Sequence, residues 1–75
     1  MAAQYAIKGA TAKGITSSVE QAVAEGGLGP GDALPPVRRL ADELGVSAGT
    51  VATAYKELRQ RGIVVTRGRG GTVVA

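Results

Sequence analysis

The fold of this chain is decided by residues 34–61, LPPVRRLADELGVSAGTVATAYKELRQR. Apolar residues recur there at spacings of three and four, first after two prolines that can start a helix and then after Ser47, a favourable N-cap. Gly45 can end the first helix and Gly62 the second. Two amphipathic helices so close together cannot bury their apolar stripes separately, so the pattern predicts a helix-turn-helix. The two stripes are Val37, Leu40, Ala41 and Leu44, followed by Val51, Ala54, Tyr55 and Leu58.

A further helix is predicted before this pair, over residues 11–25. Its apolar stripe should pack across the other two helices and complete a three-helix core. Residues 26–32, GGLGPGD, are rich in glycine and proline and are predicted to form a loop with Leu28 as a core anchor. The loop lacks the ending of a phosphate-binding loop, GK followed by Ser or Thr, so we interpret it as structural. The stripe of the first helix is Ile15, Val19, Ala22 and Val23.

A β-hairpin is predicted at the C-terminal side. Residues 63–67 are rich in β-branched side chains, residues 68–71 read GRGG, and residues 72–74 form a second short strand. Ala33 and Leu34 can add a third, very short strand. The predicted fold class is therefore mainly α with a small β-hairpin: a winged helix-turn-helix with three helices and a two- or three-stranded wing sheet. We expect this domain to span residues 11–75, after a flexible N-terminal segment of residues 1–10.

Composition narrows the function classes. The chain of 75 residues has no Cys and no His, which excludes disulfides and removes the commonest metal ligand and general base. Because no paired carboxylates can be set in a recognisable pocket, we do not expect an enzyme, a metal site or a cofactor in this chain. No apolar run has the length of a membrane span, so we expect no membrane association and a cytoplasmic protein.

Positive charge is concentrated in the helix pair and the hairpin. The formal net charge is +3, and seven of the nine Lys and Arg residues lie from Ala33 onward, with only three of the six acidic residues. This distribution favours a polyanionic partner. A basic but merely solvated surface is the alternative, and it applies equally to the two arginines of the hairpin.

Two segments carry a resemblance to a known family. Residues 29–64, GPGDALPPVRRLADELGVSAGTVATAYKELRQRGIV, and residues 67–74, RGRGGTVV, resemble the gluconate-repressor (GntR) family of bacterial transcription factors. The resemblance covers residues 11–75. It is strongest to the MocR-like branch, whose DNA-binding domain is fused to an aminotransferase-like domain, and to the YtrA-like branch, which shares the AY-x-x-L helix.

The resemblance implies a sequence-specific DNA-binding domain. It implies double-stranded DNA as the partner, a homodimer for the full-length regulator, and pyridoxal phosphate or another effector bound in a C-terminal domain outside this sequence. It also assigns residues to DNA: an arginine near the start of the second helix, hydroxyl side chains at the start of the recognition helix, and residues of the wing. These are Arg38, then Ser47 and Thr50, then Arg67, Arg69 and Gly70.

Helical geometry predicts further DNA-contacting residues on the recognition helix, residues 47–61. They lie on the face opposite its apolar stripe. This face carries Gly49, Thr53, Lys56 and Gln60, with Ala52 on its flank and Ala48 in the first turn. Many family members have arginine where this chain has the two alanines. Small side chains would let the helix enter the major groove deeply and contact thymine methyl groups. We also expect the free backbone amides of Gly49 and Thr50 to suit one phosphate.

Alternatives remain for several of these residues. Arg38 can pair with Asp42 four residues on. Tyr55 is interpreted as a core residue with its hydroxyl at the surface. The cations of the last two helical turns form either a solvated face or backbone contacts; we favour the solvated face for Arg59 and Arg61 and leave Lys56 open. The rival function is a winged helix that binds another protein.

Overall fold

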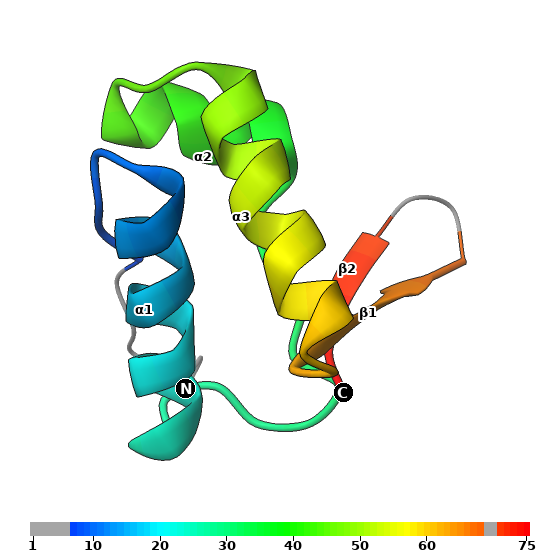
Figure 1. The fold of residues 1–75 in the computed structure, drawn as a ribbon. Coiled ribbons are helices and arrows are strands. Elements are labelled where there is room, and N and C mark those ends of the chain that lie inside the picture. Colours follow the sequence, from blue (N-terminus) through cyan, green and yellow to red (C-terminus); the bar gives the residue numbers. More distant parts are fainter. Residues whose placement is uncertain (1–6, 69–70) are drawn as a thin grey trace.

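A computed structural model describes residues 7–68 and 71–75; the expectations for residues 1–6, Arg69 and Gly70 lie outside the described residues. The described part contains three helices and an antiparallel hairpin (Figure 1), which confirms the winged helix-turn-helix class. In chain order the elements are α1 (Ala12–Ala24), α2 (Val37–Leu44), α3 (Ala48–Gln60), β1 (Val64–Arg67) and β2 (Gly71–Val74).

The helix boundaries follow from local chemistry. Thr11 caps α1 by accepting a hydrogen bond from the Gly14 amide at 3.0 Å. Helix α2 starts directly after Pro36 and ends at Gly45, whose φ of 69° is the left-handed conformation that glycine adopts without strain. Ser47 then caps α3, so only two residues separate the end of α2 from this cap.

The core forms where α1 and α2 both pack against α3. The predicted stripe of α3 is buried along its whole length, and the stripes of α1 and α2 are buried or half-buried. Leu28 anchors the loop after α1, as predicted, and Leu34, Val64 and Val74 carry the core beneath the hairpin. These contacts bury the inner face of α3 and leave its outward face exposed.

The N-terminal segment contributes one core residue that periodicity did not predict. Ile7 is only 8% exposed and belongs to the core cluster. The neighbouring Lys8 amide donates a hydrogen bond to Ser18 Oγ at 2.9 Å, which attaches this segment to α1. A single apolar residue outside a periodic stretch gives no pattern, so its burial depends on where the chain enters α1.

Strand β2 lies between β1 and the loop before α2. Val64 faces Val74 in the β1–β2 ladder. On the other side of β2, Ala33 forms a single antiparallel bridge with Val73, and the Leu34 amide donates to Thr72 O at 2.8 Å. The predicted third strand is thus present as one bridge, because the prolines that follow have no amide to extend the ladder.

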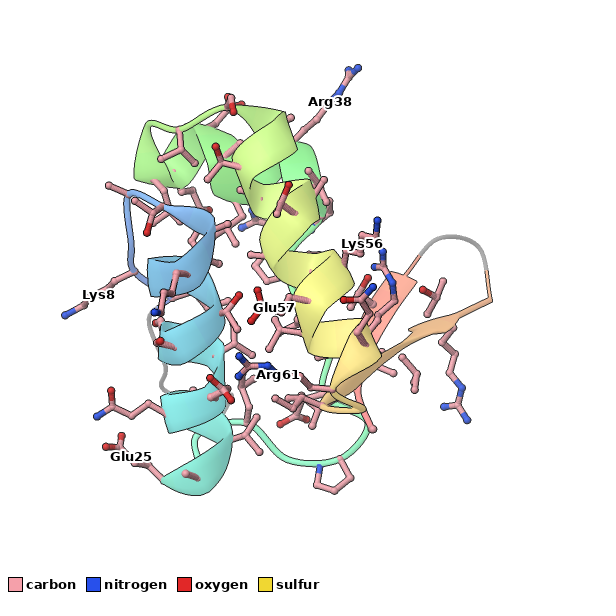
Figure 2. The ribbon with its side chains drawn as sticks, in the orientation of Figure 1. Lys8, Glu25, Arg38, Lys56, Glu57 and Arg61 are labelled. Carbon is pink, nitrogen blue, oxygen red and sulfur yellow. The ribbon has the colours of Figure 1, made fainter. Side chains whose placement is uncertain are left out.

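Arg61 joins α1 to α3. Its guanidinium lies 2.7 Å from Glu20 of α1 and 2.7 Å from Glu57 of α3 (Figure 2). Arg61 is 48% exposed, in line with the solvated face favoured from the sequence, but its two ion pairs were not predicted. The pairing depends on how closely α1 approaches α3, which the local sequence does not encode.

We expect Arg61→Ala to lower the free energy of unfolding by only about 0.5–1 kcal/mol, because the arginine side chain is 48% exposed and water screens both pairs. Urea denaturation followed by circular dichroism measures this change. Arg59→Ala is the matched control, since Arg59 is exposed and makes no ion pair within the described residues. Equal effects of the two substitutions would contradict a structural role for the Arg61 pairs.

Candidate nucleic-acid interface

The exposed face of α3 is lined by small side chains along its first two turns. Ala48, Gly49, Ala52 and Thr53 are all exposed, while the opposite face of the helix is buried in the core. Lys56, in the third turn, is the first long cationic side chain on this face and projects on the side where the hairpin lies (Figure 2). The predicted outward stripe is therefore accessible, and its narrow first half lets the α3 backbone come close to a partner.

The Ser47 cap accepts a hydrogen bond from one of the backbone amides at the N-terminus of α3. Ser47 Oγ accepts a hydrogen bond from the Thr50 amide at 3.2 Å and lies 2.9 Å from Thr50 Oγ1. The expectation that the Thr50 amide is free was wrong, because the cap uses it. The Gly49 amide makes no hydrogen bond within the described residues, so it stays available to an anion.

Arg38 stands in the first turn of α2 and is exposed. The alternative pairing with Asp42 is not observed, and Arg38 makes no ion pair within residues 7–68 and 71–75. Its side chain extends away from the fold, on the side of α3 opposite to α1 (Figure 2). The next residue behaves differently, because Arg39 pairs with Glu43 at 3.2 Å.

The wing contributes one described basic residue, Arg67, at the end of β1. It is exposed, stands opposite Gly71 in the ladder, and has no ion pair in the part of the chain that the structure describes. Figure 1 shows the hairpin projecting from the helices on the side of α3 that faces away from α1. Arg69 and Gly70, also predicted to contact DNA, lie outside the described residues.

Tyr55 lies in the core, as predicted, but the predicted surface position of its hydroxyl was wrong. The residue is 2% exposed, and its hydroxyl donates a hydrogen bond to Pro35 O at 2.7 Å. The loop before α2 folds back over α3 and brings this carbonyl to the tyrosine. Sequence reasoning missed the contact because the partners are 20 residues apart and one is a backbone atom.

The described residues give little support for a metal site, a ligand-binding pocket or a membrane-spanning helix. Residues 7–68 and 71–75 contain no group of three or more acidic, His or Cys residues that could hold a metal. A hollow of about 650 Å³ lies beside α2, but its charged lining residues are Arg39 and Glu43, which pair with each other. Among the helices described, none is long and apolar enough to cross a membrane.

Comparison with known proteins points to one family. The family model described as "Bacterial regulatory proteins, gntR family" matches residues 11–74. The vitamin B6 salvage pathway transcriptional repressor PtsJ of Salmonella typhimurium is 48% identical over 68 residues, covering 91% of this chain and 16% of PtsJ. The chain spans half or less of the length of three curated bacterial relatives that it matches.

Solved structures share the fold. YtrA from Sulfolobus acidocaldarius, a GntR-family transcription factor, superposes with a TM-score of 0.80 at 34% identity and covers 100% of this chain and 82% of YtrA. The AraR DNA-binding domain in complex with operator ORX1 gives 0.79 at 25% identity, covering 85% of this chain and 77% of that domain. A pyridoxine biosynthesis regulator and YtrA are among the matches, which supports the two branches named from the sequence.

Proposed function

The chain belongs to the gntR family of bacterial regulatory proteins, and we propose that it binds double-stranded DNA as the winged helix-turn-helix domain of a transcriptional regulator. The observation that carries this proposal is the exposed, small-residue face of α3, together with Arg38 and Arg67, two exposed arginines that make no ion pair within the described residues. The AraR domain, of the same fold, was solved with its operator.

In the proposed complex, α3 enters the major groove and the wing contacts the backbone or the minor groove. The methyl groups of Ala48 and Ala52 would meet thymine methyls, and Thr53 would offer a hydroxyl to a base edge. Arg38, Lys56 and Arg67 would contact phosphates, which position the helix and supply affinity without reading sequence. Ser47, Gly49 and Thr50 would place the start of α3 against one phosphate, chiefly through the Gly49 amide.

For the full-length regulator we propose a homodimer acting in the cytoplasm on two half-sites, with effector binding outside the sequence described here. The chain itself is proposed to be a binding module rather than an enzyme, in line with relatives that are transcriptional regulators. A protein-binding role has less support. Val65 is the one large apolar side chain exposed in the described part of the chain, and one such residue does not form an interaction patch.

Arg38→Ala tests the proposal through salt dependence. The affinity for a duplex selected from a random-sequence pool by the wild-type chain is measured over a salt series by fluorescence anisotropy. We expect the slope of log K against log salt to fall by about 0.9, because one phosphate contact is lost. Arg39→Ala removes the same charge from the adjacent position, where Glu43 already pairs with it, and should leave the slope unchanged.

Equal slopes for Arg38→Ala and the wild type would remove Arg38 from the interface. If the wild-type chain selected no duplex at low salt, the DNA-binding proposal itself would be wrong.

A further inference from the structure

The hydroxyl of Tyr55 connects the recognition helix to the wing. It donates to Pro35 O at 2.7 Å, and the preceding residue, Leu34, donates its amide to Thr72 O of β2 at 2.8 Å. Ala33 extends the same attachment through its bridge to Val73. Two hydrogen bonds, joined by the consecutive residues Leu34 and Pro35, thus connect the buried face of α3 to β2.

In the described residues the backbone of α3 approaches β1 closely but not β2. Strand β2 is otherwise held to α3 through its ladder with β1 and through Val74 in the shared core. The junction also retains a hollow of about 80 Å³, lined by residues 34–37, Tyr55, Gly71 and Thr72. Side chains thus leave unfilled volume between the helix and the wing, and the Tyr55 hydrogen bond to Pro35 O lies beside it.

The carbonyl oxygen of Pro35 accepts its hydrogen bond from the Tyr55 hydroxyl. Helix α2 begins by using the next carbonyl, since the Leu40 amide donates to Pro36 O at 3.0 Å. Pro35 O accepts no backbone hydrogen bond within the described residues. A phenylalanine would fill the same core volume, so the hydroxyl serves to place this loop rather than to bury apolar surface.

We propose that the Tyr55 hydroxyl is a positioning group that fixes the wing relative to α3, so that the helix and Arg67 reach the same duplex together. This inference rests on the proposed function. The tyrosine touches no DNA; it acts through the loop of residues 33–35 and β2. Its loss should therefore weaken the contribution of the wing while leaving the exposed face of α3 intact.

Tyr55→Phe, Arg67→Ala and the double variant test the proposal on the duplex selected by the wild-type chain. We expect Tyr55→Phe to weaken binding about three- to tenfold and to lower the salt slope by about as much as Arg67→Ala, because the wing phosphate contact is lost in both. In the Tyr55→Phe background, Arg67→Ala should then lower the affinity for the duplex by less than about twofold. Such non-additive effects are expected of two residues that are coupled.

Thr16→Val is the matched control. Thr16 is buried in α1 and its hydroxyl donates to Ala12 O at 2.9 Å, so this variant also loses a hydroxyl hydrogen bond, but away from the wing. All affinities are measured well below the melting temperature of every variant. We expect Thr16→Val to bind with the wild-type affinity and salt slope even though it melts earlier.

Amide hydrogen exchange gives a second readout that does not require a variant to bind DNA. The Leu34 amide should be protected in the wild type and should lose protection in Tyr55→Phe but not in Thr16→Val. Wild-type affinity and slope in Tyr55→Phe, or an unprotected Leu34 amide in the wild type, would overturn the positioning role while leaving the proposed function standing. Failure of the wild type to bind any duplex would overturn both.

Discussion

Leu58→Ala is expected to lower the free energy of unfolding by about 2–5 kcal/mol. Leu58 is fully buried in the core cluster on α3, the helix that packs against α1, α2 and β1. Truncation therefore removes apolar contacts and leaves a cavity that the surrounding elements cannot fully close. A domain of 75 residues has a total stability of only about 5 kcal/mol. The variant should therefore be largely unfolded at 37 °C, as measured by urea denaturation and thermal melting.

Lys56→Ala is the control for this prediction, because Lys56 lies two residues away on the exposed face of the same helix. Its stability should stay within about 0.5 kcal/mol of the wild type. A loss below about 1 kcal/mol for Leu58→Ala would contradict the central position of α3 in the core. DNA binding would disappear with the fold in this variant, so it does not report on the interface.

Ala52→Glu is expected to abolish DNA binding while the domain stays folded. Ala52 is exposed on the outward face of α3, so a glutamate is accommodated in the free protein. In the major groove the same side chain would add bulk and bring a negative charge among phosphates, a juxtaposition that costs several kcal/mol. We expect affinity for the selected duplex to fall by about 100-fold or more, measured by fluorescence anisotropy at low salt.

Ala24→Glu makes the same change on the exposed end of α1, and it should weaken binding by no more than about threefold through net charge alone. Thermal melts of both variants must show folded protein at the assay temperature. If Ala52→Glu bound as well as Ala24→Glu, the outward face of α3 would not be the DNA-contacting surface.

The helices and hairpin could be predicted because their signals are local and repeated. Apolar periods of three and four, glycines at helix ends, Ser47 at a cap and a β-branched run around a Gly-rich turn each define one element. The outward face of α3 follows from the same periodicity, because the residues opposite the predicted buried stripe must lie on the exposed side of the helix. The short strand at Ala33 and Leu34 was also predicted, because the prolines limit it to two residues, whereas its pairing with Val73 was not.

What the sequence left open depends on contacts between distant segments. The Arg61 pair with Glu20 spans 41 residues, and the Tyr55 bond to Pro35 O spans 20 and ends on a backbone atom. Ile7 has no periodic neighbours, yet the entry of the chain into α1 places it in the core. In each case the partner is set by how the elements pack, which side-chain spacing does not encode.

The structure bears on the residues predicted to contact DNA only through their exposure and hydrogen bonds. The exposure of the α3 face and of Arg38 agrees with the sequence analysis, whereas the Thr50 amide is used by the Ser47 cap. Ala48 and Ala52 place only methyl groups on this exposed face. Base discrimination by this chain therefore depends on methyl contacts and on Thr53 more than on long hydrogen-bonding side chains, if the proposed complex forms.

DNA is proposed to be bound through the outward face of α3 and the wing. The most direct test is a titration of the isotopically labelled chain with the selected duplex, followed by amide chemical shifts. We predict that the perturbed amides gather at residues 47–56, at Arg38 and at residues 66–68 and 71, with little change along residues 17–25 of α1. Shifts gathered on α1 or around the hollow beside α2, or no shifts at low salt, would contradict DNA binding through α3 and the wing.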